Sequence, residues 1–326
     1  MKHVVLPTPK NHRLIFYLAM EEYLARVLKE EGFFMWQVDP TVIFGRNQLM
    51  ENEVNLSYCK HEKIQLYRRK SGGGCVYSDR GNIMLSYITR GDNVGFLFDC
   101  FLRRLAFILK KMGVNAEVSG RNDITIEGRK VSGNAFYKTP ENCIVHGTLL
   151  FDSDFEKMQK AITPSTAKME SKGVESVRSR VTNLREYTDM DIEDFKRYVI
   201  GEFCKDGELK LTDEDVKNIE SIEQTYLEDD FFKGKNPVYT IKKHHHLKGV
   251  GEVSLNVDLK NEVIRQIRIE GDYFSFENDV EKEVNDLLRG VSMQQEAVEE
   301  ALKNFDMTKH IMGFTTAQFI EILVKP

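Results

Sequence analysis

Runs of apolar residues at helical and alternating spacing divide the chain into two parts. In the first, residues 11–31 place Leu14, Leu18 and Tyr23 at helical spacing, which predicts an amphipathic helix ended by Gly32. A second long helix is predicted at residues 96–112. Shorter β-type runs predict strands at 33–38, 41–44, 64–67, 83–89, 117–118, 124–126 and 144–151.

The pattern changes after residue 189. Residues 189–231 read as helical, acidic and polar, and a Gly/Pro break follows at 233–237. Beyond it, 250–257 and 263–269 predict a hairpin across 258–262, and helices are predicted at 278–288, 294–304 and 315–324. Runs of strands with long helices between them, without strict βαβ alternation, favour an α+β class. We therefore expect a large mixed-sheet domain over 1–240 and a small α/β domain over 245–326.

Composition narrows the class of protein. Apolar residues make up 41% and charged residues 30%, typical of a globular protein, and the net charge of −5 argues against general nucleic-acid binding. Five scattered cysteines without a CxxC pair fit a reducing compartment better than a disulfide framework. The N-terminus lacks the apolar core of a secretory signal, and no apolar run is long enough to span a bilayer. We expect a cytoplasmic monomer.

A glycine loop at residues 71–74 carries the first chemical signal. Three glycines follow the basic triplet 68–70 and precede the β-prone pair Val76-Tyr77. Glycine permits positive φ, so such a loop can point several backbone N–H groups at one anion, and arginine adds forked donors. An ordinary hairpin turn is the alternative, but a turn rarely needs three glycines.

Two further polar stretches extend this signal. One joins residues 120–123 to residues 128–135 and includes Asp123 and Lys130; the other is the basic loop 172–181. Activation of a carboxylic acid by ATP needs such parts: N–H groups and cations for the phosphates, an oxygen donor for Mg²⁺ and a fixed ammonium. Asp123 is the candidate metal ligand. Lys130 is the candidate ammonium, although a lysine at such a position is often only a solvated surface group.

Several of these blocks resemble one family. Residues 68–82 are similar to the RRxSGGGAVYHDxGN motif of lipoate–protein ligases, and residues 120–123, 130–135, 146–150 and 171–184 resemble its later blocks in order. Residues 249–272 resemble the family's small C-terminal domain. Two positions depart from the pattern: Cys75 stands where alanine is usual and Ser78 where histidine is usual. We interpret Cys75 as structural, and Ser78 lacks the hydrogen-bonding imidazole that the usual histidine would supply.

The resemblance implies the fold of biotin and lipoate ligases and a two-step reaction. Lipoate and MgATP give lipoyl-AMP, and a lysine of a lipoyl domain of a 2-oxoacid dehydrogenase E2 subunit, or of the glycine-cleavage H protein, then takes the lipoyl group. Lys130 is implied to be catalytic, contacting both the carboxylate and the α-phosphate, and the small domain is implied to be a moving lid. The implied ATP and lipoate site comprises Arg69, Ser71, Gly72, Gly73, Gly74, Cys75, Val76, Tyr77, Asn82, Asp123, Lys130, Gly133 and His146. The implied adenylate-binding loop comprises Lys172, Gly173, Val174, Ser176, Val177, Arg178 and Arg180.

Two alternatives remain. An octanoyl or lipoyl transferase of the same fold would use a cysteine thioester and no ATP, and Cys143 lies three residues before His146. Positions three apart in a strand face opposite sides, which disfavours that pair. A non-catalytic lipoate- or nucleotide-binding protein is the second alternative, disfavoured by the presence of Lys130 and Asp123.

Other local patterns carry little weight. The run 244–246 of three histidines is expected to be a solvated turn, because lysines flank it and adjacent residues alternate faces. Residues 249–251 are half of a dinucleotide fingerprint without its third glycine. No His-Glu or Ser-His-Asp arrangement is evident in the sequence.

Overall fold

The computed structural model describes residues 1–162, 180–233, 241–276 and 279–325. Its first part is built on a mixed eight-stranded sheet in the order β11-β1-β2-β6-β10-β9-β8-β7. Strand β1 pairs in parallel with both β2 and β11, and the other pairs of this sheet are antiparallel. The strands are β1 (Lys2–Val5), β2 (Gly32–Trp36), β6 (Asn82–Arg90), β7 (Ala116–Ser119), β8 (Asp123–Ile126), β9 (Arg129–Lys138), β10 (Asn142–Leu150) and β11 (Glu208–Lys210).

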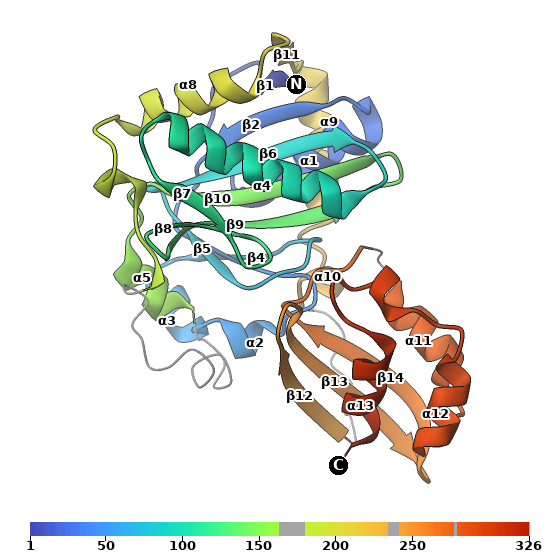
Figure 1. Cartoon of the computed structure of the whole chain (residues 1–326). Coiled ribbons are helices and arrows are strands. Elements are labelled where there is room, and N and C mark those ends of the chain that lie inside the picture. The colour runs from blue at the N-terminus through green and yellow to red at the C-terminus, as the bar shows by residue number, and fades with distance from the viewer. Residues whose placement is uncertain (163–179, 234–240, 277–278, 326) are drawn as a thin grey trace.

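Helices cover both faces of this sheet. Helices α4 (Val94–Lys111) and α8 (Ile192–Phe203) pack one face through phenylalanines such as Phe98, Phe101 and Phe203 (Figure 1). Helices α1 (Leu14–Glu22) and α9 (Asp213–Gln224) pack the other face. The α+β class and the mixed sheet are therefore confirmed.

A smaller sheet carries the glycine loop. It has the order β4-β3-β5, with β3 (Thr41–Phe44), β4 (Gln65–Arg68) and β5 (Val76–Ser78). The loop thus joins the end of β4 to the start of β5. Short elements beside these sheets are α2 (Met50–Glu53), α3 (Leu56–His61), α5 (Phe155–Ala161), η2 (Leu184–Glu186) and α10 (Asp229–Lys233).

The C-terminal part forms its own core at one end of the larger part (Figure 1). Its antiparallel sheet has the order β12-β13-β14, and the predicted hairpin is present. The turn residues Asn261 and Glu262 both have positive φ, as a two-residue type I′ turn requires. Its elements are β12 (Ile241–Leu247), β13 (Gly251–Lys260), β14 (Val263–Gly271), α11 (Val280–Leu288), α12 (Gln295–Leu302), η3 (Met307–Lys309) and α13 (Thr316–Val324).

Three sequence predictions are corrected. The first helix is not amphipathic: every residue of α1 is buried, it continues as the π-helix η1 (Tyr23–Leu28), and Lys29 with positive φ ends it before Gly32. The acidic region 189–231 contains strand β11 as well as helices, because β11 completes the sheet beside β1. The histidine run lies in strand β12 instead of a turn. Among the described helices, none has the length and apolar character that crossing a bilayer demands.

Candidate active site

One cavity brings the separate sequence blocks together. It measures about 600 Å³, counted with the solvent space at its mouth. The cavity lies between the glycine loop and strands β9 and β10. Among the residues that the sequence predicted for the site, those that line the cavity are Arg69, Gly73, Gly74, Cys75, Val76, Lys130, Gly133 and His146. The other lining residues are Leu18, Trp36, Ile43, Met84, Asn122, Asn134, Ala135, Gly147 and Thr148.

Lys130 supplies the ammonium group of this cavity. Its Nζ lies 2.7 Å from Asp123 Oδ1, and its side chain keeps 38% exposure. The Lys130 carbonyl accepts a hydrogen bond from Thr182 N–H at 2.9 Å, and Lys130 forms an isolated parallel bridge with Val181. The strand that holds Lys130 is thus paired with the chain that follows the basic loop. Of that loop's predicted residues, Arg180 is described and half-buried, whereas Lys172, Gly173, Val174, Ser176, Val177 and Arg178 lie outside the described residues.

The buried guanidinium of Arg69 holds the backbone of the glycine loop in place. Its guanidinium donates to the carbonyls of Gly72 at 2.7 Å and Gly74 at 2.7 Å, to the carbonyl of Ile43 at 3.3 Å and to Ser71 Oγ at 3.1 Å. Complete burial lowers the pKa of Arg69 to about 10, so the group still carries its charge at neutral pH. Its donors hold the backbone of the glycine loop, and Arg69 also lines the cavity.

A buried chain of polar side chains fixes His146. His146 Nε2 lies 2.7 Å from Ser71 Oγ, and Nδ1 lies 2.9 Å from a carboxylate oxygen of Glu21. Glu21 also accepts from Ser86 Oγ at 2.5 Å, and Ser86 Oγ accepts from Trp36 Nε1 at 2.9 Å. Ser71 Oγ also accepts a hydrogen bond from Arg69 Nε at 3.1 Å, so both ring nitrogens of His146 have partners that are themselves held in place. Ser71, His146 and Glu21 thus form a Ser-His-Glu chain of hydrogen bonds, which was not predicted from the sequence. Ser71 does not line the cavity, so the chain orients His146 and offers no nucleophile.

The sequence carries a signal that Glu21 has a buried partner. Glu21 and Glu22 stand inside an otherwise apolar run at 14–25, where the structure buries both carboxylates. A carboxylate in such a run needs a buried partner. Glu22 has Lys70 at 2.8 Å, so each acid of the pair is matched.

Besides Ser71, four predicted residues take places outside the cavity wall. Tyr77 and Asn82 are buried away from it, where Asn82 Nδ2 donates to the Tyr77 carbonyl at 3.3 Å. Gly72 lies against the C-terminal part, since a Cβ there would overlap the Tyr273 carbonyl. Asp123 reaches the site through Lys130. The departure at Ser78 is harmless for packing, because its Oγ is buried against Met84 Sδ at 3.4 Å.

The residues near Asp123 fit a magnesium ion that is held mainly by phosphate. Among the described residues, no three His, Cys, Asp or Glu side chains are grouped to hold a metal ion. Mg²⁺ bound with a nucleotide needs only one or two carboxylates, because phosphates and waters supply its other ligands. Asp123 provides one carboxylate, and the neighbouring Asn122 lines the cavity.

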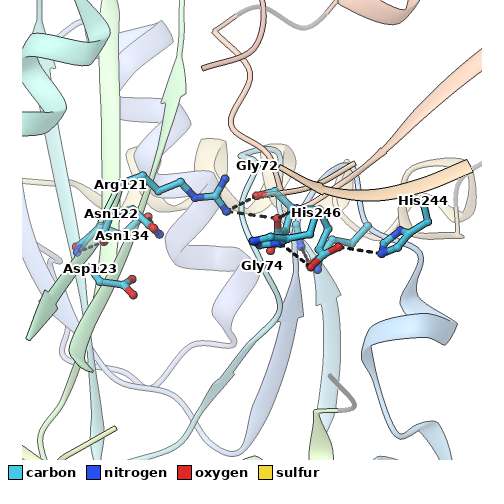
Figure 2. A network of polar contacts seen from close by, with 12 residues as sticks. Gly72, Gly74, Arg121, Asn122, Asp123, Asn134, His244 and His246 are labelled. Atoms are coloured by element: carbon cyan, nitrogen blue, oxygen red, sulfur yellow. Dashed lines mark hydrogen bonds and ion pairs between the residues drawn. The ribbon is translucent and has the colours of Figure 1, made fainter. Parts of the chain in front are cut away.

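The histidine run has structural partners. His244 Nε2 lies 2.8 Å and His246 Nδ1 lies 3.0 Å from the two oxygens of Glu252, which is buried (Figure 2). The alternation along β12 places these two histidines on one face and His245 on the other. The expected turn is therefore wrong, whereas the exposure of the three histidines agrees with the expectation.

Substitution of Gly147 tests the packing of the cavity wall. A Cβ on Gly147 would overlap Asn134 Oδ1, and Asn134 is itself fixed by hydrogen bonds to the Asn122 carbonyl at 3.1 Å and to Ser132 Oγ at 3.0 Å. We expect Gly147→Ala to displace Asn134 and to lower the free energy of unfolding by about 1–3 kcal/mol. Chemical denaturation measures this. Gly201→Ala on helix α8, where no atom lies within 4 Å, is the control and should be neutral or slightly stabilising.

Comparison with known proteins agrees with these blocks. Residues 14–204 match the family described as the lipoyl protein ligase A/B catalytic domain, and residues 236–323 match the bacterial lipoate protein ligase C-terminus. The chain is 36% identical over 315 residues to lipoate–protein ligase 1 of Staphylococcus aureus, covering 94% of this chain and 95% of that protein. It is 34% identical over 318 residues to lipoate-protein ligase LplJ of Bacillus subtilis, covering 94% and 95%.

Solved structures share the fold. A crystal structure of P. falciparum LipL1 in complex with lipoate aligns with a TM-score of 0.77 at 21% identity, covering 99% of this chain and 98% of that chain. A lipoate-protein ligase A bound with ATP aligns with a TM-score of 0.62 at 22% identity, covering 72% and 99%.

Proposed function

Because this chain belongs to the lipoate–protein ligases, and is thus an ATP-dependent enzyme that joins lipoate to protein, we propose that both of its half-reactions take place at the cavity between the glycine loop and Lys130. The observation that supports this is the shared wall: Gly73 and Gly74 of the loop, Lys130 of β9 and His146 of β10 line one space. An acid and a nucleotide held there are close enough to react.

The first half-reaction joins lipoate to the α-phosphate. Apolar side chains such as Leu18, Trp36 and Met84 suit an acyl chain, while Lys130 offers a cation to the carboxylate and the α-phosphate. A carboxylate oxygen attacks the α-phosphorus, the bond to the bridging oxygen breaks, and pyrophosphate leaves with that electron pair. The Lys130 ammonium reduces the repulsion between the two anions as they approach.

Lys130 contacts Asp123 before the substrates bind and contacts the substrates afterwards. In this structure Asp123 neutralises Lys130. When the substrates bind, their oxygens compete for the ammonium, and the Asp123 carboxylate would then be one residue that could hold Mg²⁺. The ion would supply charge neutralisation on the phosphates. Asn122, one residue away, is the second oxygen donor at this end of β8.

In the second half-reaction an acceptor lysine attacks the lipoyl carbonyl. Its amine nitrogen forms the amide bond, AMP leaves and a proton is lost from nitrogen. We propose lipoyl domains of 2-oxoacid dehydrogenase E2 subunits, or the glycine-cleavage H protein, as acceptors. A bi-partite lipoate protein ligase from Thermoplasma acidophilum with its E2 lipoyl domain has this fold at a TM-score of 0.64. We further propose that the chain acts as a cytoplasmic monomer, with 1–240 as the catalytic domain and 245–326 as a mobile accessory domain.

The alternative thioester route requires Cys143 to act as the nucleophile. That thiol is fully buried in the core under α4, its burial raises its pKa to about 12, and His146 faces the cavity instead. A thiol with a raised pKa stays protonated at neutral pH and is a poor nucleophile. We expect Cys143→Ala to retain lipoylation of an apo lipoyl domain within about twofold of the native rate. Loss of acceptor modification with intact folding would favour the transferase.

The proposed function is tested most simply by product analysis. Incubation with MgATP should release pyrophosphate only when lipoate is also present. Release of pyrophosphate without lipoate, or its absence in a folded protein, would contradict the adenylation step.

A further inference from the structure

The ammonium of Lys130 lies over the backbone of Gly133. A Cβ built on Gly133 would be only 2.7 Å from Lys130 Nζ and 2.8 Å from its Cε. The place of the ammonium therefore depends on two neighbours, the Gly133 backbone and the Asp123 carboxylate. These two neighbours come from paired strands, because Asp123 of β8 lies opposite Gly133 of β9.

Strand β9 is irregular directly after Lys130. Its pairing with β8 shifts register between Ile124 and Thr125, which leaves Val131 without an opposing residue in that strand. Such a β-bulge bends the strand, redirects its side chains and weakens the ladder locally. Contacts besides the β8–β9 ladder must therefore fix the backbone around the ammonium.

The side-chain amide of Asn134 supplies such contacts. Its Nδ2 donates to the Asn122 carbonyl at 3.1 Å and to Ser132 Oγ at 3.0 Å, so both of its hydrogens are used. Asn122 Nδ2 donates back to the Asn134 carbonyl at 2.9 Å (Figure 2). Asn122 immediately precedes Asp123 in the chain, and Ser132 immediately precedes Gly133. One amide thus holds the backbone beside both neighbours of the ammonium.

The orientation of the Asn134 amide is fixed in a site where Asn134 is only 3% exposed. Because the Asn122 carbonyl only accepts hydrogen bonds, the amide turns its nitrogen toward that carbonyl. Its Oδ1 then lies against Gly147 of β10, where a Cβ would overlap it, and has no hydrogen-bond partner among the described residues. Thr148 of the same strand adds support, since its Oγ1 lies 3.3 Å from both the nitrogen and the carbonyl oxygen of Gly133.

We propose that Asn134 is a positioning residue for adenylation, which fixes the Lys130 ammonium at the point where the carboxylate and the α-phosphate meet. It acts through Lys130 and the backbone around it. A displacement of about 1 Å at a catalytic group lowers a rate by as much as about 10²-fold, so this support has a measurable effect. The inference rests on the proposed function for the reaction itself. The sequence did not indicate Asn134, because its partners are set by the pairing of β8 with β9.

Asn134→Leu tests the proposal, because leucine has a similar branched shape and forms none of these hydrogen bonds. We expect single-turnover formation of lipoyl-AMP at saturating lipoate and MgATP to slow about 30-fold or more, while the dissociation constant of lipoate changes less than about threefold.

Ser132→Ala is a second test at a residue that does not line the cavity, since it removes one partner of the amide. We expect it to slow the same step about fivefold. Ser153→Ala changes a buried serine whose hydroxyl has no partner among the described residues, so it is the matched control and should be neutral. A native rate in folded Asn134→Leu and Ser132→Ala proteins would refute the positioning role.

A double-mutant cycle with Lys130→Ala separates positioning from a general loss of structure. Because Asn134 acts through Lys130, Asn134→Leu should change the residual adenylation rate of Lys130→Ala by less than about twofold. Equal losses in the two backgrounds would show that Asn134 acts independently of Lys130, and the proposal would be wrong. A native protein that releases no pyrophosphate with lipoate and MgATP would instead refute the proposed function.

Gly133→Ala tests the premise that the place of the ammonium limits the rate. The atoms that the added methyl group would overlap are the last two of the flexible Lys130 side chain. The ammonium should therefore move aside while the free energy of unfolding stays nearly unchanged. We expect lipoyl-AMP formation to slow about tenfold or more. Formation at the native rate by a folded Gly133→Ala protein would overturn the proposal.

Discussion

Lys130→Ala is expected to reduce lipoate-dependent pyrophosphate release by roughly 10³-fold, the size of effect seen when one group that stabilises developing charge is removed. Lys130 is the one ammonium among the described residues that line the cavity, and its side chain is 38% exposed. Its ion pair with Asp123 is partly exposed, so we expect the free energy of unfolding to change by no more than about 1 kcal/mol.

The measurement is single-turnover formation of lipoyl-AMP, followed by chromatography of the products. Lys138→Ala is a matched control, because this lysine lies further along the same strand β9 and outside the cavity wall. A Lys130→Ala protein that forms lipoyl-AMP at a near-native rate would exclude Lys130 from the adenylation step. A variant that is unfolded by denaturation assays would contradict the expected stability.

Arg69→Ala is expected to have the second large effect, and for a structural reason. The Arg69 guanidinium satisfies the carbonyls of Ile43, Gly72 and Gly74. Its removal takes a donor from each of these carbonyls, at a cost on the order of 3 kcal/mol in the free energy of unfolding. The loop then loses the shape that presents its N–H groups, so ATP and lipoate binding should both weaken by at least about tenfold.

Arg69→Lys separates this account from a direct phosphate contact. An ammonium cannot donate to Gly72 and Gly74 with the fixed geometry of a guanidinium, so we expect stability and binding to fall nearly as far as in Arg69→Ala. Substantial rescue by lysine would indicate that charge alone matters. Arg103→Ala on the exposed face of α4 is the control and should be close to neutral. Denaturation and ligand titration on the same samples give both quantities.

The sequence alone predicted the parts of the site that lie within motifs. The glycine loop, Lys130 and His146 come from separate blocks, and the structure brings all of them to one cavity. The α+β class and the C-terminal hairpin also followed from apolar spacing and turn residues.

What the sequence did not predict depends on contacts distant along the chain. The direction of Arg69 follows from the carbonyls packed around it, and Glu21 reaches His146 across 125 residues. Strand β11 is three residues long and exists because β1 offers it a partner. The docking of Gly271 to Phe274 on the glycine loop also gives two of the three glycines a second purpose. Gly72 leaves room for the Tyr273 carbonyl, and Gly73, at φ +88°, faces the Phe274 ring. A local pattern carries none of this information.

Product analysis with an acceptor protein tests most directly whether this chain joins lipoate to protein at the expense of ATP. The native chain is incubated with lipoate, MgATP and an apo lipoyl domain, and the acceptor is weighed by mass spectrometry while pyrophosphate is counted. We expect each modified acceptor to gain one lipoyl group and one pyrophosphate to be released with it. Acceptor modification without pyrophosphate, or ATP and lipoate binding without any modification, would contradict it.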